Sequence, residues 1–312
     1  MLILAFASIA RAEDDSIPKV VPRVFAIELV RPERAGNVFE VSLRAERKIG
    51  YRGGPRADDS IEKAKNARVQ TRSQLIELDA HVEVLKVDSE GRVLKQALTV
   101  TRWKFDDDDD GDLEFDLLRK MLIAETIDGE TQFSIDGEPV NEYHCELLRM
   151  IVTTYRGGGS VDAEFGSRQR RKVGETWPVH LDDEAKAAFG RSLPTEASWQ
   201  KALPAGTAKL TKVATVANVP CLFLDVEFEC SNSPALRELF SDSGDENVPV
   251  EHTELTYSFS GQYPVDSARH CARQRETCRF MAITTTTDES YWVQQVVEDT
   301  VTREFRNARE KD

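Results

Sequence analysis

The chain has 312 residues, an apolar fraction of 40% and a formal net charge of −14 at pH 7. This length and composition suit one large globular domain or two smaller ones, and they exclude an intrinsically disordered chain. The negative charge repels nucleic-acid phosphates and anionic lipid headgroups, so we expect no nucleic-acid partner and no electrostatic attachment to a membrane.

The N-terminus predicts a protein exported from the cell. Residues 1–12 read Met-Leu-Ile-Leu-Ala-Phe-Ala-Ser-Ile-Ala-Arg-Ala. An apolar run that closes on small residues at positions −3 and −1 is typical of a signal peptide, here cleaved after Ala12. The basic residues that normally precede such a run are missing, which indicates a peptide truncated at its start; a buried N-terminal strand is the alternative. No later apolar run is long enough for a transmembrane span, so we expect a periplasmic or extracellular protein.

Alternation of apolar and polar residues dominates the chain and predicts long antiparallel strands. In residues 76–84 every even position is apolar, and every odd position is charged or histidine. Similar runs predict strands at residues 38–48, 93–105, 131–135, 209–217, 222–230, 254–263, 279–287 and 291–305. Asp-Gly pairs at 128–129 and 136–137 predict a hairpin turn at each end of the short strand 131–135.

Helices are few in the predicted fold. An apolar stripe predicts one main amphipathic helix over residues 139–155, with Pro139 as its first residue. Short helices are expected at 182–189 and 234–240. The predicted organisation is a first β-rich half with the helix at 24–156, a linker or crossing at 157–181, a second β-rich half at 182–306 and a polar tail at 307–312. The fold class is therefore mainly β or α+β, with long antiparallel hairpins that form a curved sheet or half-barrel.

An acidic run gives the only candidate metal site. Asp106, Asp108 and Asp110 stand at positions 1, 3 and 5 of a calcium-loop pattern, with Asp112 and Glu114 close behind. Position 12, which should carry a bidentate glutamate, is a leucine, and the run follows a predicted strand. The pattern therefore predicts a weak Ca²⁺ site or, as the alternative, a solvated acidic hairpin loop.

An exported protein can form disulfides, and among the five cysteines we predict one such bond. Cys271 and Cys278 bracket six polar residues, and a bond between them would staple a hairpin. Cys221 and Cys230 lie on one predicted strand, roughly 30 Å apart, and cannot reach each other.

A short mid-chain stretch carries a family resemblance. Residues 165–179 read Phe-Gly-Ser-Arg-Gln-Arg-Arg-Lys-Val-Gly-Glu-Thr-Trp-Pro-Val. The export signal, the long hairpins and this Val-Gly-x-x-Trp motif resemble exported β-rich bacterial proteins of unknown function. The resemblance implies a β-rich periplasmic or surface protein and brings no catalytic residues. From its size and rigidity, Trp177 beside Pro178 is expected to anchor the crossing to the sheet.

No known catalytic motif occurs in the sequence: the phosphate-binding loop, the nucleophile elbow and the zinc-protease pattern are all missing. The leading hypothesis is a non-enzymatic binding or envelope-associated protein. It would carry an apolar ligand in a concave sheet, or recognise a partner through a sheet face or edge. The alternative is a hydrolase whose site is assembled from distant residues, with His81, His144 or the acidic run as candidates.

Overall fold

The computed structural model describes residues 23–29, 32–55, 65, 69–108, 115–152, 154, 165–179, 206–232, 249–285 and 291–307. The predicted signal peptide, both predicted short helices and the glycine-rich run 157–160 lie outside these residues.

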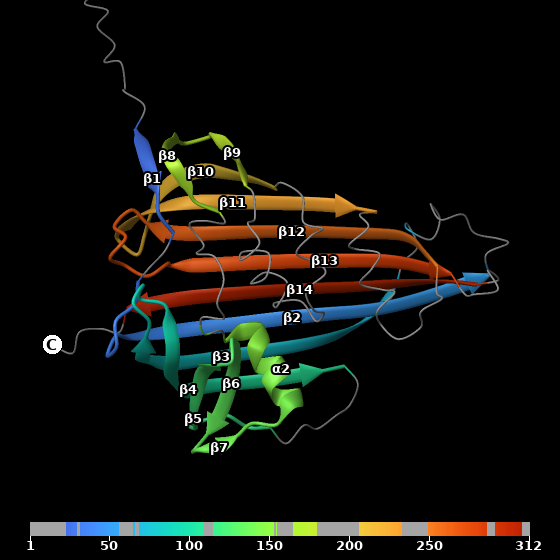
Figure 1. The fold of residues 1–312 in the computed structure, drawn as a ribbon, viewed down its shortest axis with the longest axis horizontal. Helices are drawn as coiled ribbons and strands as arrows, with labels where there is room; N and C mark the ends of the chain where they lie inside the picture. The colour runs from blue at the N-terminus through green and yellow to red at the C-terminus, as the bar shows by residue number, and fades with distance from the viewer. Residues whose placement is uncertain are drawn as a thin grey trace, which may run out of the picture.

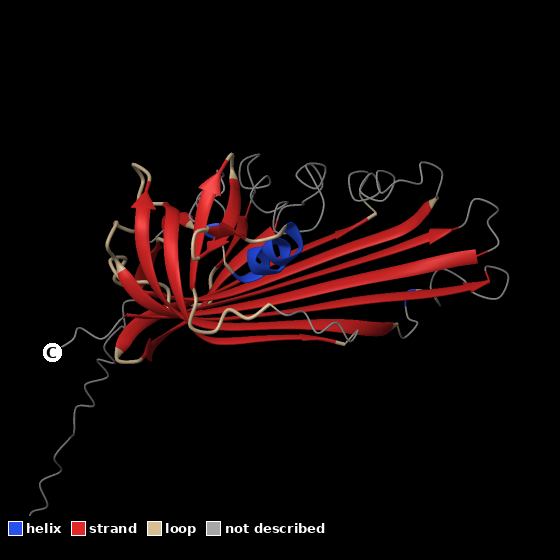
Figure 2. Ribbon diagram, turned by 90° about the horizontal axis from the view of Figure 1, so that it is seen from below, coloured by secondary structure: helices blue, strands red, loops and turns tan. Residues whose placement is uncertain are grey.

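One antiparallel sheet of twelve strands forms most of the fold (Figure 1), in the order β7-β6-β5-β4-β3-β2-β14-β13-β12-β11-β10-β9. The first half contributes β2 (Val38–Pro55), β3 (Gln70–Val87), β4 (Val93–Asp107), β5 (Met121–Ile127), β6 (Glu130–Ile135) and β7 (Glu138–Pro139). The second half contributes β9 (Thr176–Val179), β10 (Gly206–Val216), β11 (Val219–Ser231), β12 (Val250–Pro264), β13 (Arg273–Thr285) and β14 (Tyr291–Asn307). The sheet curves but does not close (Figure 2), which confirms the predicted mainly β fold with a curved sheet.

The join between the two halves is the pairing of β2 with β14. It runs without interruption from Phe39 opposite Asn307 to Pro55 opposite Tyr291. All other neighbours in the sheet follow one another in strand number, so this is the one place where the large sheet brings distant parts of the sequence together. The two predicted halves therefore share one continuous sheet.

The predicted alternation places apolar side chains on one face of the sheet. In β3, Ile76, Leu78, Ala80, Val82 and Val84 are at most 3% exposed. Their odd-numbered neighbours point to the opposite face, which we call the polar face. A one-residue shift in register would exchange the two faces, so the alternation also fixes the register.

Two covering elements complete two hydrophobic clusters on the apolar face. Helix α2 (Glu142–Ile151) packs Leu147, Leu148 and Ile151 into the cluster of strands β2–β5. A small sheet of β1 (Val24–Ile27) and β8 (Ser167–Lys172) covers the strands β9–β13 with Ile27 and the adjoining Phe165. The basic run inside the predicted linker is therefore folded as β8, and the linker also contains β9.

The main helix is shorter than predicted. Pro139 belongs to β7, and the helix begins after Asn141, whose side chain accepts a hydrogen bond from the His144 amide at 3.0 Å. Asparagine satisfies an otherwise unpaired amide at this position, which the proline cannot do, so the helix begins three residues later than expected.

A charged seam separates the two clusters on the apolar face. Arg47 of β2 makes two hydrogen bonds of 2.8 Å to Asp299 of β14. Arg303 of β14 pairs with Glu276 of β13. Because these central strands carry ion pairs where the outer strands carry apolar residues, hydrophobic alternation fades along them.

The predicted tryptophan anchor is confirmed. Trp177 in β9 is 3% exposed and belongs to the cluster formed by β9–β13. Its indole N–H donates to the Gly166 carbonyl at 3.1 Å, so the polar atom of the buried ring is satisfied.

Candidate binding site on the polar face

The polar face is open to solvent along β11 and along the parts of β12 and β13 that lie beside it, up to Thr256 and Arg279; beyond them Met281 and Ile283 are buried. The apolar-face neighbours of these strands are buried, whereas Asp225, Ser258, Ser260 and Arg275 are exposed. Antiparallel register sets Asp225 opposite Ser260 and Ser260 opposite Arg275, so side chains from the three strands form a straight row across the sheet.

Small hydroxyl side chains line the middle strand of this surface. The polar face of β12 presents Thr256, Ser258 and Ser260, followed by Gln262. Short side chains keep the middle strand low between its neighbours. We call these four residues, together with the flanking polar-face residues of β11 and β13, the β12 strip.

The two sides of the β12 strip carry opposite charge. The β11 side presents the acidic row Asp225, Glu227 and Glu229. The β13 side presents the basic row Arg273, Arg275 and Arg279. The registers place Asp225, Glu227 and Glu229 opposite Ser260, Ser258 and Thr256, and Arg273, Arg275 and Arg279 opposite Gln262, Ser260 and Thr256.

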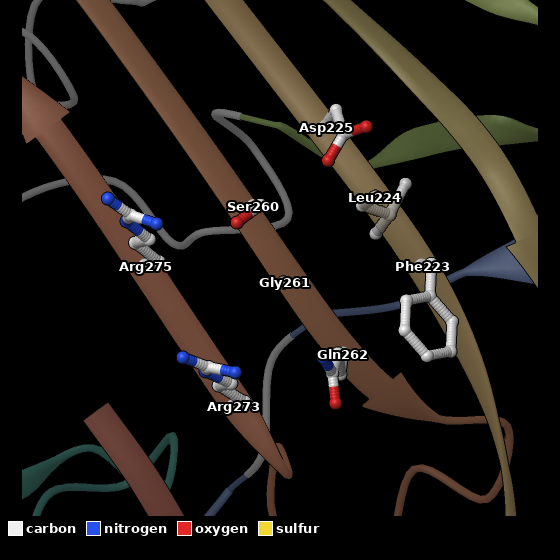
Figure 3. A pocket seen from close by; sticks show the side chains of 8 residues that line it. All are labelled: Phe223, Leu224, Asp225, Ser260, Gly261, Gln262, Arg273 and Arg275. Carbon is white, nitrogen blue, oxygen red and sulfur yellow. The ribbon is translucent and has the colours of Figure 1, made fainter. Parts of the chain in front are cut away.

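One end of the strip is hollowed into an open recess of about 210 Å³. Figure 3 shows Arg273 and Arg275 along one strand and Asp225 on another, with Ser260 on the strand between them. Phe223 closes the acidic side of the recess, and Lys212 places its ammonium 4.4 Å from the centre of the phenyl ring. The recess therefore combines two guanidinium groups, one carboxylate and one aromatic wall.

Arg275 stands in the recess without an ion pair to any described residue. Its neighbours across the strands are Ser260 and Thr302, both neutral. Arg273 in contrast has Glu304 at 3.4 Å.

The acidic side of the recess is only partly compensated. Partial burial and the neighbouring Glu227 raise the pKa of Asp225, while Lys209 lowers it by a smaller amount. Lys209 lies opposite Asp225 on β10. A further cation beside Asp225 would stabilise its ionised form.

The structure describes only the start of the predicted calcium loop. Asp106 contacts Lys104 at 3.1 Å, and Asp108 accepts a hydrogen bond from the Ser73 amide at 2.8 Å. These contacts attach the loop to neighbouring strand residues. Asp110, Asp112 and Glu114 lie outside the described residues. Within the described part of the chain, no three metal-ligating side chains lie close enough to hold an ion.

The predicted disulfide between Cys271 and Cys278 is not formed in the structure, where the five cysteines make no disulfide bond. The polar residues between the two are not a hairpin loop, because β13 already begins at Arg273. Five residues of extended chain from Arg273 to Cys278 span roughly 16 Å, far beyond disulfide reach. Cys221 and Cys230 both lie on β11, as predicted, and do not bond to each other.

The two histidines proposed for catalysis lie apart. His81 is on the polar face of β3, 3.6 Å from Glu40. His144 stacks on Phe115 with ring centres 3.9 Å apart, and burial lowers the pKa of its imidazole. Two other histidines reach carboxylates, His252 to Glu254 at 2.8 Å and His270 to Glu33 at 2.9 Å. Among the described residues, no serine, threonine or cysteine side chain is hydrogen-bonded to any of these imidazoles.

The β12 strip was not predicted as a site. The sequence shows Thr, Ser, Ser and Gln at alternate positions of the strand, which is a visible signal for a polar face. It does not show that an acidic and a basic strand flank this face, because that depends on the pairing of β11, β12 and β13. The basic row was also missed because residues 272–277 were interpreted as a loop and not as part of a strand.

No protein-family model and no curated protein matches the chain. Among the described helices, none has the length and apolar character that a membrane crossing requires.

Proposed function

We propose that this chain is an exported, non-enzymatic binding protein that recognises a partner through the β12 strip. The observation that carries the proposal is the pair of oppositely charged rows that flank β12, with a recess at one end where Arg275 pairs with no described carboxylate. Charged groups arranged in this way favour a specific, correctly oriented partner more than they favour tight binding. The apolar start of the sequence supports the exported location.

The recess supports recognition of a partner better than carriage of an apolar ligand. Sites for such ligands are mostly apolar cavities of roughly 300–1,000 Å³. The recess measures about 210 Å³, and three of its lining residues are charged. On the opposite face, α2 and Phe165 pack directly into the two hydrophobic clusters. A surface that receives one or a few partner side chains fits these dimensions.

The proposal is tested with a photo-crosslinking amino acid at Thr256 of the β12 strip. Thr99 is the matched control, because it is also an exposed threonine in a strand but lies in β4, remote from the strip. Cells that produce the protein are irradiated, and adducts are identified by mass spectrometry. We expect a discrete adduct from Thr256 that is absent from Thr99 and is lost when Arg275→Glu is added. Equal adducts at both positions, or none at Thr256, would overturn the proposed function.

A further inference from the structure

We propose that the β12 strip binds an extended peptide segment whose side chains are alternately acidic and basic. The inference rests on the proposed function and names the chemistry of the partner. It starts from three rows of side chains whose spacing and charge are set by the sheet itself.

The first step is the match in spacing. Along a strand, side chains on one face recur every two residues, about 6.6 Å apart. Arg273 and Arg275 have this spacing, as do Asp225, Glu227 and Glu229. An extended peptide has the same repeat along each of its edges. A peptide parallel to β12 therefore keeps its side chains in step with both rows.

The second step is the match in charge. Successive side chains of an extended peptide point to opposite sides, so those at even positions would meet one row and those at odd positions the other. Acidic side chains on one edge pair with Arg275 and its neighbours, and basic side chains on the other edge pair with Asp225, Glu227 and Glu229. A peptide of a single charge sign would meet one attractive and one repulsive row. The acidic row likewise disfavours a nucleic-acid backbone.

The third step concerns the floor of the strip. From Thr256 to Gln262 it extends for about 20 Å, which matches roughly six residues of extended chain. Ser258, Ser260 and Thr256 present hydroxyl groups that both donate and accept hydrogen bonds. They can satisfy the amide and carbonyl groups that the peptide backbone turns toward the sheet. The recess beside Phe223 has room for one larger side chain at the end of the segment.

The test uses two labelled eight-residue peptides of identical composition, one alternating Lys and Glu and one with four Lys followed by four Glu. Both are net neutral, so the charge of the protein favours neither. Fluorescence anisotropy at low salt is expected to show that the alternating peptide binds at least tenfold more tightly. Equal affinity for the two peptides would overturn the inference.

Charge reversal on the protein makes the test specific. Arg275→Glu and Asp225→Lys are each expected to weaken binding of the alternating peptide at least tenfold. The double variant should bind more weakly than either single variant, because the unchanged residues of both rows hold the peptide in its original register while both reversed charges now repel it. Glu83→Lys is the matched control for Asp225→Lys: it makes the same charge change at an exposed site on β3 and should leave the affinity unchanged. A double variant that binds as tightly as the unmodified protein, or single variants that bind as tightly as Glu83→Lys, would overturn the inference.

The two proposals fail in different ways. If Thr256 gives its Arg275-dependent adduct while neither peptide binds preferentially, the binding function stands and the alternating-charge partner is wrong. If the adduct is missing, the function itself falls, whatever the peptides do.

Discussion

The ion pair between Arg47 and Asp299 is expected to hold the two halves of the sheet together, and removing one partner tests this directly. The side chains of Arg47 and Asp299 are only 19% and 10% exposed, and two hydrogen bonds of 2.8 Å join them. Burial by itself would lower the pKa of Arg47, but the hydrogen bond and charge of Asp299, with a contribution from Glu146, outweigh it and raise the pKa. The guanidinium therefore stays charged at every pH at which the fold survives.

Asp299→Ala leaves that buried charge without its partner. Breaking a fully buried pair costs about 3–5 kcal/mol of unfolding free energy. Because Arg47 retains some contact with water, we expect a loss of about 2–4 kcal/mol. Replacing both residues by apolar ones, Arg47→Met with Asp299→Leu, removes the unpaired charge and should recover most of this loss.

The neighbouring pair of Lys48 with Glu298 is the internal control. It lies one residue along the same two strands on the polar face, at 3.8 Å and with side chains 41% and 34% exposed. Glu298→Ala should cost less than about 1 kcal/mol, as exposed pairs do. Urea unfolding followed by circular dichroism measures all four proteins. The reasoning is refuted if Asp299→Ala costs no more than Glu298→Ala, or if the double apolar variant is as unstable as Asp299→Ala.

Three further predictions concern the cores. Trp177→Ala should destabilise the fold by about 3–5 kcal/mol in the same urea assay, and a loss below about 1 kcal/mol would contradict its role as an anchor. Burial, with the nearby carboxylates Asp299 and Glu276, raises the pKa of the Cys278 thiol. The unfolded thiol therefore ionises first, and stability should fall as the pH rises above about 8.5, an effect that Cys278→Ala should remove. Burial lowers the pKa of His144, so the unfolded state binds its proton first. Stability should accordingly fall as the pH drops below about 6.5, and His144→Phe should flatten this dependence in thermal melts.

The outer strands were predictable because each has a buried and a solvated face. The alternation in residues 76–84 corresponds to side chains that are indeed buried and exposed in turn along β3. The central strands follow the same geometry with different chemistry. Gln274 and Glu276 of β13 face the charged seam instead of a hydrophobic cluster, so both faces of that segment are polar in the sequence. Because the two faces of this segment do not differ in polarity, the strand resembled a loop in the sequence, and a disulfide between Cys271 and Cys278 was expected to close it.

The pairing of strands far apart in the sequence could not be predicted, for a different reason. Residues of β2 and β14 that face each other are up to 268 positions apart, as Phe39 and Asn307 are, and no local pattern records that distance. The same limit applies to the candidate site. Each of its three rows is visible as alternate polar residues, but their order across the sheet depends on which strands are neighbours.

The sheet also determines how well the β12 strip can recognise a partner. Strand β12 is paired with β11 over residues Glu254–Pro264 and with β13 from Val250 to Gln262, so the backbone of the strip is fixed on both sides. Exposed ion pairs are worth only about 0.2–1 kcal/mol each, and flexible side chains would lose most of that to ordering. A fixed backbone reduces this cost, and several weak pairs in register can then add up. A partner whose charges are out of step gains one or two pairs and meets repulsion at the others, so discrimination would come from the spacing of the strands and not from any single residue.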